Sequence, residues 1–260
     1  MFHSANFLHY RDRCRHHESI TVIGSGQSAA EVFYDLLQTQ EMYGYRLIWH
    51  TRAPGFFPME YSKLGLEHFS PDYIRYFYSL PSYRRDQVLA QQNLLYKGIS
   101  FSTIADIYDL LYQRSIAGNK LHVQLLPLVE LKEVEKIENQ YRLGYRHVEQ
   151  DEHFSHNAHC IILATGYHHA IPECIAGIRS LIQWDEQERY RVNLNYRLEL
   201  TQAIPNQIFV QNGELHTHGV GAPDLGLGAY RNSVIINTLT GKTVYSTDQR
   251  NVFQEFGIAA

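Results

Sequence analysis

The feature that most constrains the fold of this chain is a glycine motif that stands between an apolar run and an amphipathic segment. The run Ile20-Thr21-Val22-Ile23 is rich in β-branched residues and predicts a short buried parallel strand. The motif itself, Gly24-Ser25-Gly26-Gln27-Ser28-Ala29, has the spacing G-x-G-x-x-A. After it, apolar residues recur three and four positions apart up to Leu37, which predicts a helix with one apolar face. A second strand, expected over residues 47–49, completes a right-handed βαβ unit.

The small residues of this motif match the steric needs of a dinucleotide site. Gly24 permits the tight turn between strand and helix, and Gly26 lets a pyrophosphate approach the backbone. Ala29 allows the helix to pack closely on the strand. The free N–H groups at the start of the helix then face the phosphates. The alternative is a tight strand-to-helix turn that binds no ligand, but the position of the motif directly after a strand favours a dinucleotide.

The end of the second strand distinguishes between NAD and NADP. An NAD site places an acidic residue there, and its carboxylate accepts a hydrogen bond from the ribose 2′-hydroxyl. Here the sequence reads His50-Thr51-Arg52, without an acid. Arg52 can pair with a 2′-phosphate through two charge-assisted hydrogen bonds, and the alternative is a solvated surface arginine. The sequence therefore favours NADPH.

The rest of the chain predicts an α/β protein built around this Rossmann-like unit. Apolar side chains have helical spacing over residues 71–117, and a last helix is expected over residues 229–239. Four more segments are expected to be strands: 125–137, 141–147, 158–164 and 207–211. The first three supply a β-meander, with a hairpin at 138–140. We divide the chain into a lead-in segment (1–18), an NADPH-binding domain (19–170) and a C-terminal part (171–260).

Charge, hydropathy and cysteine content exclude several classes of function. With a formal net charge of −4, the chain has no electrostatic reason to bind nucleic acid. It has no apolar run near the roughly 20 residues that span a bilayer, and no apolar signal segment at its start. Cys14, Cys160 and Cys174 form no C-x-x-C pair, which argues against a disulfide scaffold or a zinc site. A reducing cytoplasm is the expected setting.

Closely spaced histidines suggest metal ligands at first sight. His153, His156 and His159 are three residues apart, and His168-His169 and His216-x-His218 form two close pairs. A spacing of three places side chains on opposite faces of a strand, and carboxylates at ligand spacing are missing. We therefore expect no metal site.

Several segments resemble the flavin-dependent lysine/ornithine N-monooxygenases of siderophore biosynthesis. The general resemblance rests on VIGSGQSAAE at 22–31, LATGY at 163–167 and ELHTHG at 214–219. Three more segments look like the L-lysine N6-monooxygenase branch: FFPMEY at 56–61, LYKGI at 95–99 and PDLGLGAYRNS at 223–233. The resemblance implies an enzyme that uses NADPH, FAD and molecular oxygen to N-hydroxylate the side-chain amine of L-lysine. The L-ornithine N5-monooxygenases are the related alternative.

The resemblance also implies which residues bind the cofactor NADPH and the substrate. Gln27, Ser28 and Arg52 would contact NADPH. Asn93, Tyr96 and Lys97 lie on the segment that, in the ornithine enzymes, carries an NYS-type motif near nicotinamide and substrate. This chain reads Leu95-Tyr96-Lys97 there, so Asn93 is the nearest candidate for the asparagine that binds the substrate. The alternatives are a helix-surface amide for Asn93 and an exposed lysine for Lys97.

A second group of residues would line the flavin. His218, Asp224, Leu225 and Gly226 belong to this group by resemblance. The helix that is expected from residue 229 would favour an anionic reduced flavin through its dipole, by roughly 0.3–1 kcal/mol. The alternative is a glycine-rich surface loop.

The division of labour in this family makes a catalytic nucleophile unnecessary, because the flavin performs the chemistry while the protein supplies position and a dry site. Family members begin with an FAD-binding unit that has its own glycine motif, whereas the residues before Gly24 contain no glycine. We therefore expect the chain to lack the N-terminal FAD-binding segment and to combine the NADPH domain with the C-terminal portion of a split FAD domain. By itself it should retain no FAD and hydroxylate no lysine. The alternative is an inactive NADPH-binding remnant that serves as a homo-oligomer partner.

Overall fold

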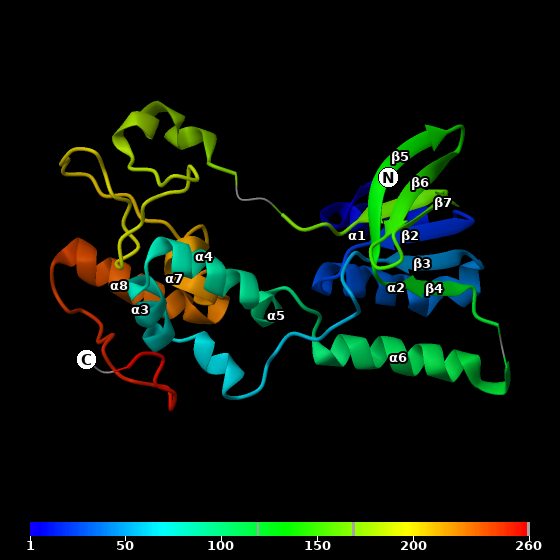
Figure 1. The fold of residues 1–260 in the computed structure, drawn as a ribbon, viewed down its shortest axis with the longest axis horizontal. Coiled ribbons are helices and arrows are strands. Elements are labelled where there is room, and N and C mark those ends of the chain that lie inside the picture. Colours follow the sequence, from blue (N-terminus) through cyan, green and yellow to red (C-terminus); the bar gives the residue numbers. More distant parts are fainter. Residues whose placement is uncertain (119, 168–169, 259–260) are drawn as a thin grey trace. The chain divides into compact units, whose positions relative to one another are not determined.

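The computed structural model describes residues 1–118, 120–167 and 170–258 (Figure 1). The chain forms two compact units and passes between them more than once. Unit 1 comprises Met1–Met59 and Lys97–Tyr167, and unit 2 comprises Glu60–Tyr96 and the chain after Tyr167.

Unit 1 is built on a five-stranded sheet whose neighbouring strands are all parallel. Its strand order is β1-β8-β2-β3-β4. The strands are β1 (Phe2–His3), β8 (Cys160–Leu163), β2 (Ser19–Ile23), β3 (Arg46–His50) and β4 (Val123–Leu126). Helix α2 (Gln27–Tyr43) connects β2 to β3, so the predicted βαβ unit is confirmed. The chain is an α/β protein, as the sequence predicts.

Alternation along β2 and β8 separates two layers on either side of this sheet. On one face, Ile20, Val22 and Ile162 join the core that the apolar stripe of α2 covers. Helices α1 (Phe7–Cys14) and α6 (Phe101–Ser115) contribute to the same core. On the other face, Ile23 and Ile161 pack against an antiparallel meander. Because successive side chains of a strand point to opposite faces, helices cover one face of the sheet and the meander covers the other.

The meander consists of β5 (Val129–Ile137), β6 (Gln140–His147) and β7 (Glu152–Ala158). The predicted hairpin is confirmed: β5 and β6 pair to the last residue on either side of Glu138-Asn139, and Glu138 has φ 50°. The segment expected as one strand over 125–137 is two strands in two sheets. A turn at Leu128, with φ 61°, carries the chain from β4 to β5. The segment expected over 158–164 likewise divides between the end of β7 and β8.

Three further expectations need correction. The lead-in segment 1–18 is part of unit 1, because β1 is an edge strand and α1 buries Phe7 and Cys14. Residues 60–96, expected in the same domain as the glycine motif, belong to unit 2, and the later boundary lies after Tyr167 rather than after residue 170. Residues 207–211 form no strand and contribute only an isolated bridge between Arg197 and Phe209.

Unit 2 is mostly helical, with irregular connections. Its α-helices are α3 (Pro71–Ser79), α4 (Ser82–Gln91), α5 (Asn93–Tyr96), α7 (Leu215–His218) and α8 (Gly228–Thr240). Its 3₁₀-helices are η2 (Gly65–His68), η4 (Glu173–Leu181), η5 (Gly219–Gly221) and η6 (Leu225–Leu227). The side chains of Tyr73, Phe77 and Val220 form a core between α3 and η5. Within the described ranges, we find no helix long and apolar enough to cross a membrane.

Candidate functional site

The first glycine of the motif is required by its neighbours. Gly24 has a φ angle of 150°, a backbone conformation that residues other than glycine rarely adopt. The N–H of Gly24 donates to the carbonyl oxygen of His50 at 3.0 Å, and the carbonyl oxygen of Gly24 accepts from the indole N–H of Trp49 at 2.8 Å. A Cβ atom here would overlap the carbonyl oxygen of Ala164, which follows β8. The turn is therefore fixed against two neighbouring strands of the sheet.

The second glycine of the motif has open space in front of it. Gly26 is the N-cap of α2 with extended backbone, and its carbonyl oxygen accepts from Ala29 and Ala30 at 3.0 and 3.2 Å. A Cβ atom on Gly26 would meet no protein atom within 4 Å. Ala29 is fully buried against the sheet. Gly26 and Ala29 thus take the positions that the motif predicts, and the chain itself does not need a glycine at position 26 for packing.

The side chain of Gln27 joins the starts of two long helices. Its Oε1 accepts from the backbone N–H of Ser100 at 2.6 Å, and its Nε2 donates to Thr103 at 3.1 Å. Ser100 is the N-cap of α6 and accepts from the N–H of Thr103. The positive ends of the α2 and α6 dipoles therefore lie beside each other. Because the Gln27 side chain is engaged in this way, the backbone N–H groups of Gln27 and Ser28 are the donors this segment offers to a ligand.

The end of β3 leaves one side chain available to solvent. His50 and Thr51 are both about 1% exposed, whereas Arg52 is exposed. The His50 ring stands edge-on to Tyr145 with 4.8 Å between the ring centroids, and burial lowers its pKa to about 4. Thr51 accepts from the N–H of Ala53 at 3.1 Å. Of the three residues that replace the expected acid, only Arg52 can reach a ligand.

In unit 2, His218 is enclosed by protein rather than exposed at the surface. Its ring stacks on Tyr196 with 4.4 Å between centroids, and its two nitrogens lie 2.8 Å from the Thr217 hydroxyl and 3.3 Å from the Leu194 carbonyl oxygen. Burial lowers the pKa of His218 to about 4, so the ring is neutral. In the described residues its contacts are to protein, and the expectation that His218 lines the flavin stays a prediction.

The turn at 223–227 is exposed at its tip and held from within. Asp224 accepts from the N–H of Gly226 at 2.7 Å, and Leu225 is 82% exposed. Beneath the turn, the buried Arg231 of α8 donates to the carbonyl oxygens of Gly221, Ala222 and Asp224, the last at 3.0 Å. Asp224, Leu225 and Gly226 therefore form one rigid exposed feature.

Glu214 balances the charge of Arg231 inside unit 2. Its carboxylate is fully buried and lies 3.9 Å from the Arg231 guanidinium. Burial raises the pKa of Glu214 to about 7. Sequence reasoning did not single out this pair. The signal available was weak: Arg231 is the one charged residue of α8, and a charge that is buried needs a partner.

The expected substrate residues divide between the units. Asn93 opens α5, is exposed, and donates from its side-chain amide to the Ala90 carbonyl oxygen at 2.9 Å. Tyr96 packs beside the core of unit 2. Lys97 is exposed and begins the second segment of unit 1. Unit 2 thus holds Asn93 and Tyr96 together on one short helix, whereas Lys97 belongs to unit 1.

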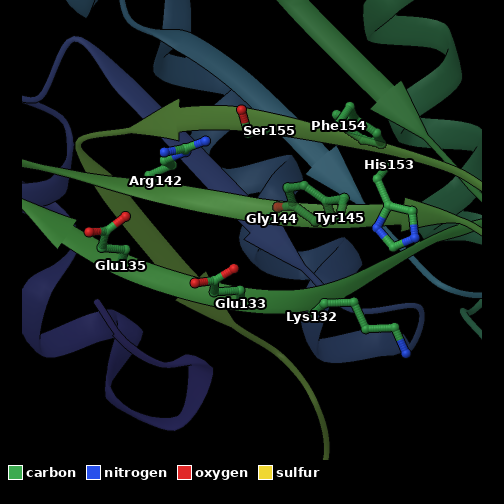
Figure 2. A pocket seen from close by; sticks show the side chains of 9 residues that line it. All are labelled: Lys132, Glu133, Glu135, Arg142, Gly144, Tyr145, His153, Phe154 and Ser155. Atoms are coloured by element: carbon green, nitrogen blue, oxygen red, sulfur yellow. The ribbon is translucent and has the colours of Figure 1, made fainter.

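A surface pocket of about 410 Å³ lies on the outer face of the meander, and no residue of the glycine motif lines it (Figure 2). Side chains of both charges line it, including Glu133, Glu135 and Arg142. His153 lies on the same face, whereas His156 turns inward toward His50, as a spacing of three predicts for a strand. No group of three metal-ligating side chains occurs in the part of the chain that the structure describes. His168 and His169 lie outside the described residues.

Comparison with known proteins places these features in context. Residues 1–169 match the family model of L-lysine 6-monooxygenase/L-ornithine 5-monooxygenase. The chain is 42% identical over 256 residues to a putrescine N-hydroxylase of Shewanella oneidensis, covering 98% of this chain and 50% of that protein. It is 29% identical over 227 residues to an L-lysine N6-monooxygenase of Escherichia coli, covering 87% of this chain and 53% of that protein. It thus spans about half the length of the curated relatives it matches.

Among solved structures, the chain is similar to the FAD-bound cadaverine monooxygenase DfoA of Erwinia amylovora's desferrioxamine pathway. The TM-score is 0.94 with 46% sequence identity, over 100% of this chain and 60% of that one.

Proposed function

Because the chain belongs to the L-lysine 6-monooxygenase/L-ornithine 5-monooxygenase family, we propose that it carries the NADPH-binding unit and part of the FAD-binding unit of an amine N-hydroxylase of siderophore biosynthesis. Unit 1 is the NADPH-binding unit in this proposal. Unit 2 contributes the C-terminal part of the FAD-binding unit and also takes in residues 60–96.

The observation that carries the NADPH assignment is the open space before Gly26, between two helix starts. The pyrophosphate would lie against the N–H groups of Gln27 and Ser28, where the dipoles of α2 and α6 both favour negative charge. Gln27 holds these helix starts together and so fixes the distance between the donors. Arg52, exposed at the end of β3, would bind the 2′-phosphate.

The FAD assignment rests on the turn at 223–227. Asp224, Leu225 and Gly226 would support the flavin, because Arg231 holds their backbone in place and the exposed Leu225 offers an apolar contact. Helix α8 begins directly after this turn with no side-chain cap, so its first N–H groups are available to a negatively charged ring. When bound and reduced, the flavin supplies the activation of oxygen. The chain's own residues position it and exclude water.

The substrate we propose is a linear aliphatic diamine, with one amino group N-hydroxylated. The relatives at 42% and 46% identity act on putrescine and cadaverine, whereas the lysine enzyme is 29% identical. L-lysine, which the local motifs favoured, is the second candidate. A diamine carries no carboxylate, so it needs no cationic partner at that end, whereas lysine and ornithine do. Asn93, Tyr96 and Lys97 stay the proposed substrate contacts by resemblance, and Lys97 suits the carboxylate of the second candidate, because its cation would repel a diamine.

A chimaeric enzyme tests this proposal. Residues 1–260 replace the matching segment of the Shewanella oneidensis putrescine N-hydroxylase, and flavin absorbance with NADPH binding verifies folding. Hydroxylamine products are then measured with putrescine, cadaverine, L-lysine and L-ornithine. We expect product from the diamines in preference to the amino acids. A folded chimaera that hydroxylates only L-lysine or L-ornithine contradicts the diamine assignment, and one that reacts with no amine contradicts the function.

A further inference from the structure

Two cysteines that are far apart in the sequence meet inside unit 1. Cys14 is the last residue of α1, and Cys160 is the first residue of β8. Their sulfur atoms lie 3.6 Å apart, both residues are at most 4% exposed, and both are free thiols. The third cysteine, Cys174, is exposed and lies in unit 2. The sequence has no C-x-x-C motif and therefore gave no sign of this pair. The fold of unit 1 brings together Cys14 from its first segment and Cys160 from its last.

A pocket gives the two thiols an opening to solvent. It has a volume of about 410 Å³, and both Cys14 and Cys160 line it. Its other lining residues include the cationic or titratable side chains of Arg13, His17 and Lys136. A small polar oxidant can therefore reach the sulfur atoms although neither thiol is exposed at the surface.

The surroundings give the two thiols different roles. A hydrogen bond from the Cys160 thiol, assisted by the positive charges of Arg13 and Arg15, lowers the pKa of Cys14 against the effect of burial. The same hydrogen bond, together with burial, raises the pKa of Cys160. Because Arg13 and Arg15 lie near Cys14, we assign Cys14 as the thiol that reacts first and Cys160 as the thiol that attacks second.

We propose that Cys14 and Cys160 are a peroxide-sensitive dithiol that closes to an intramolecular disulfide. In the first step, the Cys14 sulfur attacks one oxygen of hydrogen peroxide, the O–O bond breaks, and a sulfenic acid and one water form. In the second step, the Cys160 sulfur displaces the hydroxyl group of that sulfenic acid as a second water. Two thiols and one peroxide thus give one disulfide and two waters. The sulfur atoms need to approach by roughly 1.5 Å to reach the disulfide bond length.

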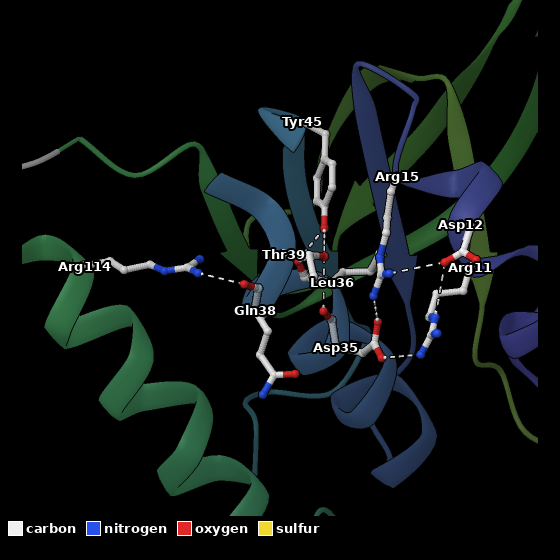
Figure 3. Close-up of polar contacts among 9 residues, drawn as sticks. All are labelled: Arg11, Asp12, Arg15, Asp35, Leu36, Gln38, Thr39, Tyr45 and Arg114. Atoms are coloured by element: carbon white, nitrogen blue, oxygen red, sulfur yellow. Dashed lines mark hydrogen bonds and ion pairs between the residues drawn. The ribbon is translucent and has the colours of Figure 1, made fainter. Parts of the chain in front are cut away.

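The crosslink would join elements that already hold the proposed NADPH site. Helix α1 is tied to α2 by Asp35, which pairs with Arg15 at 2.7 Å and with Arg11 at 3.4 Å (Figure 3). Strand β8 leads directly to Ala164, which lies against Gly24. A disulfide between Cys14 and Cys160 would therefore link α1 covalently to β8, and both elements already contact the segment that contains the glycine motif: α1 through α2, and β8 through Ala164.

Mass spectrometry of the oxidised chain tests the proposal. The reduced 260-residue chain is exposed to graded hydrogen peroxide, unfolded in N-ethylmaleimide, and digested without reductant. We expect a peptide pair linked through Cys14 and Cys160, at peroxide doses that leave most of Cys174 alkylated, and reversal by dithiothreitol. Cys174→Ser is the matched control and should form the same link. In Cys160→Ser, dimedone should trap a sulfenic acid on Cys14.

Two results would overturn the proposal. The first is that Cys14 and Cys160 both remain alkylated at peroxide doses that fully oxidise Cys174. The second is that the link forms as fast in urea-unfolded chain as in folded chain, because the contact in the fold would then contribute nothing. Circular dichroism establishes that Cys160→Ser and Cys174→Ser are folded, and the link itself is measured in the parent chain without either substitution.

Discussion

Substituting the two glycines of the motif separately should divide ligand binding from folding. A side chain on Gly26 points into space that no protein atom fills, whereas a side chain on Gly24 overlaps the Ala164 carbonyl oxygen at φ 150°. We therefore expect Gly26→Val to abolish NADPH binding while the fold persists. Gly24→Ala, although the smaller change, should destabilise the fold itself.

The structure sets the expected magnitudes. An apolar residue in place of glycine at an N-cap costs about 1 kcal/mol, which lowers the melting temperature by roughly 2–4 °C in a domain of this size. For Gly24→Ala, an overlap with backbone costs roughly 1–3 kcal/mol, and the unfavourable φ adds roughly 1–2 kcal/mol. That sum lowers the melting temperature by at least about 4 °C. The loss of NADPH affinity in Gly26→Val should be at least about 100-fold, or roughly 2.7 kcal/mol.

Calorimetric titration with NADPH and thermal unfolding followed by circular dichroism measure both effects on the same samples. Gly177→Val is the matched control, because Gly177 also faces open space but lies on η4 of unit 2. Its NADPH affinity should be that of the parent chain. Parental NADPH affinity in Gly26→Val would refute the assignment of this loop as the phosphate site. Equal destabilisation by Gly26→Val and Gly24→Ala would refute the reasoning from packing.

Three further substitutions test the charged groups. Arg52→Ala should weaken NADPH binding roughly 10- to 150-fold, the equivalent of 1.5–3 kcal/mol, and leave NADH binding unchanged in titration; equal losses would exclude a 2′-phosphate contact. Arg231→Met should lower the free energy of unfolding by roughly 3–5 kcal/mol in urea, because it leaves a buried carboxylate unpaired; a loss below about 1 kcal/mol would contradict the supporting role. Because burial raises the pKa of Glu214 from 4.5 to about 7, the parent chain should lose stability relative to Glu214→Gln as pH rises through this interval; parallel pH profiles would contradict it.

The sequence was most informative where local patterns determine structure. The β-branched run, the two glycines and the apolar stripe of α2 each follow from short-range rules, and they agree with one another in unit 1. The hairpin at 138–139 was predictable for the same reason. The motif predicts that Gly26 faces a phosphate, and the structure leaves the open space in front of Gly26 that this prediction requires.

The remaining features depend on contacts between distant parts of the chain. Residues 60–96 join unit 2 because α3 packs on the α7 and η5 segment, more than 130 positions later in the sequence. Residues 207–211 have the composition of a strand, but their pairing stops at one bridge with Arg197, while Ile208 and Val210 pack beside the core of Ile182, Val192 and Leu198. The neutral, buried state of His218 and the partnership of Glu214 with Arg231 likewise follow from burial, which a motif does not report.

Amide hydrogen exchange of the chain with and without NADPH tests whether the start of α2 binds the pyrophosphate, because it locates the ligand on the sequence. We expect slower exchange at residues 24–30 at the start of α2, at 100–104 at the start of α6, and around Arg52. NADH should protect the first two segments but not the third. Protection confined to the outer face of the meander, around residues 132–155, or absence of protection at Gly26, Gln27 and Ser28, would contradict it.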